Sequence, residues 1–165
     1  MLIFAPMRQV PNEIFFDWVS SELSEGKDVR IRMKGWSMRP LLRPGKDEVV
    51  LGTLKDGEPS RLDVVLFHYK GQTIFHRVLR IDGNEYTIQG DGNFTGKEKC
   101  GREDIVGKLR EIVRPSGAVI PVTSLRWRAY SRLWLIVRPL VGYLFRIRSC
   151  LSVLKHKKPW KNTIT

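Results

Sequence analysis

The sequence predicts a mainly β protein of the α+β class, with an antiparallel β-sheet or partly open barrel between two helical ends. Short runs in which apolar residues alternate with polar ones recur between residues 28 and 122, and this period is typical of half-buried strands. Turn sequences such as Lys70-Gly71 and Asp82-Gly83-Asn84 separate the runs, without a helical pattern between them. Several short strands at this spacing favour antiparallel pairing.

The first predicted element is a helix over residues 12–26. Asn12 follows a proline and is a suitable N-cap, because its side chain can accept a backbone hydrogen bond from the first turn. Gly26 suits the C-terminal end of the helix. Apolar residues at three- and four-residue spacing give the helix one face to bury: Phe15, Trp18, Val19 and Leu23.

A β-rich core is predicted over residues 28–122. Residues 29–34 read Val-Arg-Ile-Arg-Met-Lys, which predicts a half-buried strand that leads into Gly35. The other predicted strands cover residues 48–54, 63–69, 73–81, 85–89, 105–113 and 118–122. We therefore expect residues 1–122 to form one domain that is large enough to bury a core.

Residues 123–165 are predicted to form a basic helical tail. Residues 1–118 contain 19 Lys and Arg against 17 Asp and Glu, whereas residues 119–165 contain ten Lys and Arg and no acidic residue. Apolar and aromatic residues lie between the arginines of the tail. This pattern predicts one or two amphipathic helices, with a kink or break at Pro139.

Three kinds of partner fit this tail. Aromatic side chains among arginines are typical of a helix in the interface of an anionic membrane, which we expect for residues 123–158. Alternatively, the apolar face packs on the β-rich core or on a partner protein, and the arginines form its solvated side. Nucleic acid would be attracted by the same charges, but the apolar content of the tail disfavours it.

Composition excludes several other classes of protein. The two cysteines, Cys100 and Cys150, lie far from any pair of histidines, so we expect neither a metal nor an organic cofactor. No apolar run reaches the roughly 20 residues that a membrane-spanning helix needs, and the first residues lack the pattern of a signal peptide. We therefore expect a cytoplasmic protein that can bind peripherally to the inner face of the membrane.

The strongest candidate nucleophile is Ser37, in the segment Lys-Gly-Trp-Ser-Met-Arg-Pro over residues 34–40. A strand is predicted to end just before it, and Gly35 permits a tight turn and close approach of a substrate. Met38 can line a small apolar pocket, and Pro40 stiffens the exit of the loop. A serine hydroxyl reacts only beside a base and oxyanion donors. The alternative is a turn serine bonded to its own backbone.

The candidate base is His76, in the predicted strand 73–81, with His68 near the end of the preceding strand as a rival. A histidine on an apolar strand face can equally be a packed core residue. Asp91 lies between Gly90 and Gly92 at a strand end, which exposes its carboxylate and makes it the candidate partner for the imidazole. The alternative for Asp91 is an ordinary turn aspartate.

Several segments, in order, resemble the motifs of signal peptidases and the related LexA-type self-cleaving repressors. Residues 35–42, Gly-Trp-Ser-Met-Arg-Pro-Leu-Leu, are similar to the Gly-x-Ser-Met-x-Pro-x-Leu motif of this superfamily. Residues 75–78, Phe-His-Arg-Val, resemble the His-Arg-Val motif of the subfamily that uses histidine instead of lysine. Further similar motifs lie at residues 44–51, 62–67, 90–93 and 105–109, so the resemblance covers residues 29–113.

The resemblance implies a serine endopeptidase fold and activity, with a protein or peptide as the substrate. Ser37 would be the nucleophile, His76 the general base, and Asp91 the carboxylate that orients the imidazole. The backbone N–H of Ser37 would face the oxyanion. The other oxyanion and substrate-binding residues would be Gly35, Trp36, Met38 and Pro40.

Two departures from the family pattern leave alternatives open. Histidine-type members carry another aspartate beyond the Gly-Asp-x-Asn motif, but Lys97 stands near that position here, which leaves Asp104 as a fallback. An amphipathic helix also stands where signal peptidases have a membrane anchor. The same fold could therefore serve as a non-catalytic peptide-binding module or a membrane-associated accessory module.

Overall fold

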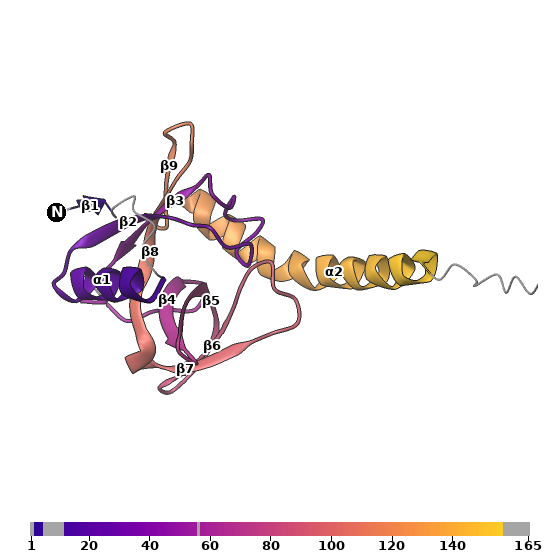
Figure 1. Ribbon diagram of the computed structural model, residues 1–165, viewed down its shortest axis with the longest axis horizontal. Helices are drawn as coiled ribbons and strands as arrows, with labels where there is room; N and C mark the ends of the chain where they lie inside the picture. Colours follow the sequence, from indigo (N-terminus) through magenta and orange to yellow (C-terminus); the bar gives the residue numbers. More distant parts are fainter. Residues whose placement is uncertain (1, 5–11, 56, 157–165) are drawn as a thin grey trace, which may run out of the picture.

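The computed structural model describes residues 2–4, 12–55 and 57–156, which form a curled sheet and two helices (Figure 1). The strands are β1 (Leu2–Phe4), β2 (Asp28–Arg32), β3 (Glu48–Gly52), β4 (Val64–Tyr69), β5 (Gln72–Asp82), β6 (Glu85–Gln89), β7 (Glu98–Gly101), β8 (Ile105–Val113) and β9 (Val119–Pro121). The helices are α1 (Asn12–Ser24) and α2 (Leu125–His156), and the short 3-10 helix η1 (Arg102–Asp104) precedes β8.

The strands lie in the order β1-β2-β3-β8-β4-β5-β6-β7, and β9 pairs with β8. Within the described ranges β1 runs parallel to β2, and all other neighbours are antiparallel. The sheet curls into a half-barrel. The predicted α+β class and the antiparallel, partly open sheet are therefore confirmed.

Two strands differ from the sequence predictions, and the second helix takes one of the forms predicted for it. No strand was predicted at β1 or β7, and β7 reads Glu-Lys-Cys-Gly, in which Cys100 alone is buried. So short a strand with a single buried position carries no detectable period. Pro139 does not split the second helix, because α2 continues through it as one element, although its ribbon changes direction along its length (Figure 1).

Strand β4 separates two hydrophobic cores. Val64 and Leu66 face the first core, whereas Val65 and Phe67 face the second. Successive side chains of a strand point to opposite faces, so a strand covered on both sides reads as a continuous apolar run. Helix α1 covers the first core with Val19 and other residues. The second core lies between β4, β5, β6 and β7.

Helix α2 begins against the sheet and then extends away from it (Figure 1). Trp127, in its first turns, is 6% exposed and belongs to the first core. That core therefore includes a residue from beyond the boundary expected at residue 122. In the described part of the chain, no helix is both long enough and apolar enough to cross a membrane.

Candidate active site

Ser37 lies in the long segment between β2 and β3, and the two ends of this segment are tied together. The N–H of Met33 donates to the carbonyl of Asp47 at 3.3 Å, and the N–H of Gly45 donates to the carbonyl of Met33 at 2.7 Å. Between these ends, Met38 is 2% exposed and packs in the first core. Ser37 is half-buried beside this anchor, so the packing of Met38 helps to set its position.

A buried ion-pair cluster centred on Asp47 fixes the exit of this segment. Asp47 accepts hydrogen bonds from the backbone N–H of Arg43 at 2.7 Å and from the Arg43 guanidinium at 2.9 Å, and it also pairs with Arg114, the residue directly after β8. Arg114 donates a further 3.1 Å bond to the carbonyl of Leu41. Burial alone would raise the pKa of Asp47, but the two arginines outweigh it and hold that pKa below its ordinary value.

The segment 90–93, between β6 and β7, lies directly against the Ser37 turn. The N–H of Gly92 donates to the Ser37 carbonyl at 2.7 Å. A Cβ atom on Gly90 would lie 2.6 Å from the Ser37 carbonyl oxygen and 2.8 Å from Nε2 of His76. Both distances are shorter than real Cβ contacts, so a side chain does not fit here. Glycine at this position thus lets the Ser37 backbone and the imidazole converge on one point.

His76, on β5, is 5% exposed and points toward that same place. Its Nδ1 atom lies 3.1 Å from Oε2 of Glu98 on β7. A carboxylate only accepts hydrogen bonds, so this contact places the imidazole proton on Nδ1 and leaves Nε2 as an acceptor. His76 therefore presents the unprotonated nitrogen that a general base uses to the segment that carries Ser37.

Burial lowers the pKa of His76 below its ordinary value, because the charged ring loses its hydration. The charge and hydrogen bond of Glu98 act in the opposite direction, as does the more distant charge of Asp91, whereas Arg138 adds to the lowering. The net direction is downward, so the imidazole is neutral at neutral pH and able to accept a proton.

Asp91 does not occupy the place that the sequence analysis expects. Its two oxygens accept 2.8 Å hydrogen bonds from Nε and Nη2 of Arg77, and the two residues are 1% and 0% exposed. An arginine buried to this degree requires a counter-charge, and Asp91 supplies it. His76 and Arg77 are neighbours whose side chains leave opposite faces of β5, so they take different carboxylates. Glu98, and not Asp91, contacts the imidazole.

Arg77 also ties the sheet to α2. Its Nη1 donates to the carbonyl of Leu62 at 2.8 Å and to the hydroxyl of Ser131 at 2.9 Å. Its guanidinium lies 5.2 Å from the ring centroid of Trp127, within the range of a cation–π contact. One buried side chain thus connects β5 with the loop before β4, the segment 90–93 and α2.

A second buried arginine reaches from α2 to the segment beside the candidate nucleophile. Arg138 is 8% exposed, and its Nη2 donates to the carbonyls of Gly90 at 3.0 Å and Asn93 at 2.5 Å. These are the first and last residues of the segment 90–93. Because Gly90 contacts both Ser37 and His76, α2 helps to position the candidate site.

The predicted substrate-binding residues lie in different environments. Trp36 is 66% exposed, with the Arg39 guanidinium 4.9 Å from its ring centroid. Met38 points into the first core, so it does not line a substrate pocket as expected. The space around Gly35 is open, and its backbone is not in the conformation that favours glycine. Pro40 is exposed at the exit of the turn.

The polar groups of Ser37 that a reaction would use are not engaged elsewhere. Across residues 12–55 and 57–156, neither its hydroxyl nor its backbone N–H makes a hydrogen bond, and its carbonyl accepts from Gly92. No hydrogen bond joins the hydroxyl to His76 within these ranges either. In enzymes without a bound substrate, hydrogen bonds between catalytic groups are often long and tighten when the substrate binds.

The rival residues lie elsewhere. His68 is exposed, and its Nδ1 lies 3.1 Å from the Thr73 hydroxyl in the β4–β5 hairpin. Asp104 accepts a 2.8 Å hydrogen bond from the N–H of Gly101, which gives it a role at the start of β8.

Cys100 is in the second core, where burial raises its thiol pKa to about 12. The described residues contain no group of three His, Cys, Asp or Glu side chains able to hold a metal ion.

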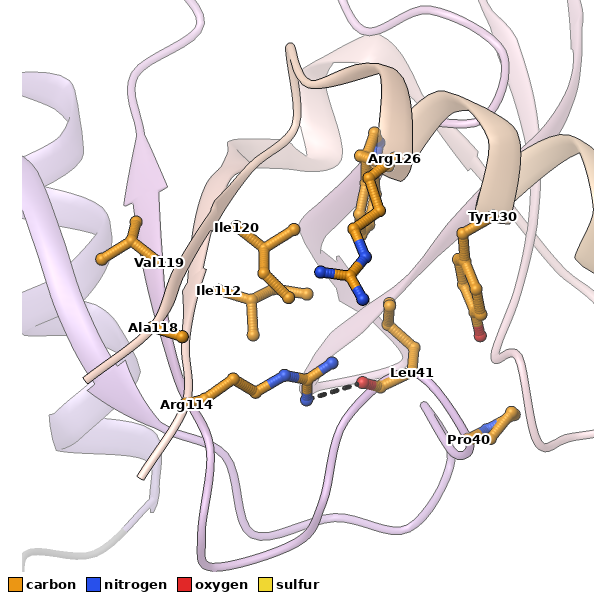
Figure 2. Close-up of a pocket in the computed structure, with 10 residues that line it drawn as sticks. Pro40, Leu41, Ile112, Arg114, Ala118, Val119, Ile120, Arg126 and Tyr130 are labelled. Atoms are coloured by element: carbon orange, nitrogen blue, oxygen red, sulfur yellow. Dashed lines mark hydrogen bonds between the residues drawn. The ribbon is translucent and has the colours of Figure 1, made fainter. Parts of the chain in front are cut away.

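Two cavities flank the first half of α2. One, of about 390 Å³, lies between α2, β8 and the loop after Ser37, where it is lined by Pro40 and Leu41. Figure 2 shows Arg126 from α2 and Arg114, which follows β8, both extending into this space. The other, of about 740 Å³, lies between α2 and the loop that leads to β7, and Phe94 lines it. The first cavity is lined by two residues of the loop that directly follows Ser37.

Glu98 is the functional candidate that the sequence analysis missed. It lies directly after Lys97, where the resemblance leaves a carboxylate missing. The comparisons give no further assignment, because no protein-family model matches the chain and no curated protein sequence matches it. The case for a function therefore rests on the residues and their geometry.

Proposed function

We propose that this protein is a serine endopeptidase of signal-peptidase type, in which Ser37, His76 and Glu98 form the catalytic group. The observation that carries the proposal is the orientation of His76. Its Nδ1 lies 3.1 Å from Glu98, while Nε2 faces Gly90 next to the backbone of Ser37. Nucleophilic catalysis by serine requires three groups: the nucleophile, a base beside it, and a group that orients the base.

In the proposed reaction, Nε2 of His76 takes the proton from the Ser37 hydroxyl as its oxygen attacks the scissile carbonyl. The protonated imidazole then gives this proton to the leaving amine when the C–N bond breaks. Water, deprotonated by the same nitrogen, hydrolyses the acyl-enzyme. Glu98 holds the Nδ1 tautomer in place and stabilises the positive charge that develops on the ring.

The oxyanion of the tetrahedral intermediate would be bound by the backbone N–H of Ser37. Support comes from the absence of any other partner for this N–H in the described ranges, since a free backbone donor is available to a developing negative charge. The 390 Å³ cavity beside Pro40 would accept an apolar side chain of the substrate, because Ile112, Ile120 and other apolar residues line most of it. Trp36 and Pro40 would then contact the peptide from the exposed side of the turn.

The direct test is covalent labelling of the purified full-length protein with a fluorophosphonate probe. We expect one adduct by intact mass, located on Ser37 by peptide mapping and absent from the Ser37→Ala variant. His76→Ala should abolish labelling, whereas His68→Ala should retain it because His68 is exposed and bonded to Thr73. Labelling that persists in a folded His76→Ala protein would overturn the proposed base.

The competing function is a non-catalytic module of the same fold that binds peptides or a membrane. The feature that favours it is the absence of a hydrogen bond between Ser37 and His76 across the described ranges. A folded wild-type protein that reacts with no serine-directed probe, at any pH between 5 and 9, would support this alternative. The pH range covers the interval in which a histidine with a lowered pKa is neutral.

A further inference from the structure

Helix α2 has an inner stripe that is covered and an outer, apolar stripe that is exposed, on different sides of the helix. The inner stripe contains Trp127, Ser131, Arg138 and Gly142, which are all buried. Together with Trp134, these residues recur at three- and four-residue spacing along the chain. They therefore lie on one side of the helix. Beyond Gly142, the Phe145 ring still stacks on Phe94 at a centroid distance of 5.5 Å. The covered side of α2 therefore extends over about half of the helix.

The outer stripe is exposed along the same length. Its residues and exposed fractions are Leu133 at 60%, Ile136 at 72%, Leu140 at 66%, Leu144 at 63% and Ile147 at 40%. They also recur at three- and four-residue spacing, which places them on one face. Tyr143, beside them, is 65% exposed. A contiguous apolar face of this length on a helix that projects from the domain marks an interaction surface.

We propose that the outer stripe of α2 binds the surface of an anionic phospholipid bilayer, with the helix lying along the plane of the interface. The positive charges of the tail favour an anionic membrane as the binding partner. Residues 119–165 contain ten Lys and Arg and no acidic residue, and Arg126, Arg128 and Arg132 are exposed just before the stripe. Leu, Ile and Tyr side chains enter the acyl boundary, while arginines contact lipid phosphates. This inference does not depend on the proposed peptidase activity.

Nucleic acid fits this surface poorly. Between residues 133 and 145 the single basic residue is Arg138, and it is buried and bonded to Gly90 and Asn93. A phosphate backbone laid along the stripe would meet apolar side chains instead of cations, although phosphate contacts supply most of the affinity for nucleic acid. Apart from Arg138 and Arg146, the basic residues of the tail lie before Leu133 or after Ile147, which is typical of a helix at a membrane interface.

A second copy of the chain is also disfavoured. Pairing of two outer stripes would bring two tails together that contain only basic charges, and like charges at an interface are repulsive. Anionic lipid removes this repulsion and attracts the same residues, at about 1 kcal/mol for each Lys or Arg near the surface.

Co-sedimentation of the full-length protein with vesicles tests the proposal. We expect binding to vesicles of phosphatidylcholine with phosphatidylglycerol, weak binding to phosphatidylcholine alone, and a loss of binding as salt is raised. The triple variant Ile136→Gln, Leu140→Gln, Leu144→Gln should lower the partition coefficient at least about tenfold. Ile14→Gln is the matched control, because Ile14 is an exposed isoleucine on α1, with an exposed fraction of 60%.

A second variant separates charge from apolar contact. Substitution of Arg126, Arg128 and Arg132 by glutamine keeps the stripe and should reduce the preference for anionic over neutral vesicles. Circular dichroism checks that each variant is folded. Equal vesicle binding by the stripe variant and the wild type would overturn the proposal. The proposal would also be overturned by a protein that binds neither kind of vesicle but binds duplex DNA or RNA. Dimerisation in solution through residues of the stripe, without vesicle binding, would overturn it as well.

Discussion

Glu98 Oε2 lies 3.1 Å from Nδ1 of His76, although the two residues stand on β7 and β5 with β6 between them. The contact forms because β7 pairs with β6 in the register that puts Glu98 opposite Ile88, and Ile88 is opposite Val78 on β5. His76 is on the same face of β5 as Val78. Curvature of the sheet then brings the carboxylate to the imidazole. The pH dependence of probe labelling can test this contact.

Glu98→Gln should shift the pH dependence of probe labelling. Labelling requires neutral His76, so its rate should rise with pH through a pKa below the ordinary value of histidine and then level off. Glu98 raises the pKa of His76, so its replacement by a neutral amide should move the acidic limb to lower pH and lower the plateau at least about tenfold. The rate constant of labelling is measured between pH 4 and 8. An unshifted acidic limb would assign Glu98 to packing alone.

Arg138→Met should act on the same profile in the opposite direction. The positive charge of Arg138 lowers the pKa of His76, so its removal should move the acidic limb to higher pH. Loss of the bonds to Gly90 and Asn93 should also reduce the labelling rate several-fold, because the segment beside Ser37 is less well held. Arg132→Met is the control, since Arg132 is exposed on the same helix. Identical profiles for the two variants would contradict the bracing role of Arg138.

Asp91→Asn should affect stability more than the position of the pH profile. It leaves the buried Arg77 without a counter-charge, and breaking a buried pair of this kind costs about 3 kcal/mol. We therefore expect the free energy of unfolding to fall by about that amount in urea denaturation. The acidic limb of labelling should move less than in Glu98→Gln, because the charge of Asp91 affects the pKa of His76 less. A limb that moved further in Asp91→Asn than in Glu98→Gln would restore Asp91 as the partner of His76.

Gly90→Ala should disable the candidate site. The added Cβ would meet the Ser37 carbonyl oxygen and the imidazole at distances below 3.0 Å, so one of them must move. We expect labelling to fall at least about tenfold and the melting temperature to drop by several degrees, as for a strained core position. Gly35→Ala is the matched control for stability, because the space around that residue is open. Differential scanning fluorimetry and probe labelling measure both, and an unchanged Gly90→Ala protein would contradict the close packing.

The regular strands and the first helix could be predicted from the sequence. Alternation in residues 29–34 marks β2, and the apolar run Val-Val-Leu-Phe marks β4 as a strand. These signals exist because burial on one face, or on both, determines the residue pattern of a strand. Strands β1 and β7 contain three and four residues, which is too short for such a pattern, and their pairing depends on the rest of the sheet.

The candidate site could be predicted only in part. Ser37 and His76 are found from their motifs, but Glu98 and Arg138 are not, because each acts through a contact across the sheet or between α2 and a loop. Asp91 has the sequence context expected of an exposed carboxylate between glycines. In the structure Asp91 is buried and pairs with Arg77. The surroundings of Arg77 include Ser131 and Trp127, which lie beyond residue 122.

The position of Arg138 on α2 has a consequence for the order in which the site is completed during synthesis. Domains form from the N-terminus while the chain is still being made. Ser37, His76 and Glu98 are all translated before residue 100, yet the carbonyls at the two ends of the segment 90–93 are bonded by an arginine that follows about 45 residues later. A nascent chain whose sheet, but not α2, has left the ribosome would contain Ser37, His76 and Glu98. It would lack the hydrogen bonds of Arg138 to Gly90 and Asn93. Such a chain should react with the probe several-fold more slowly than the complete fold, as expected for Arg138→Met, until the helix emerges from the ribosome.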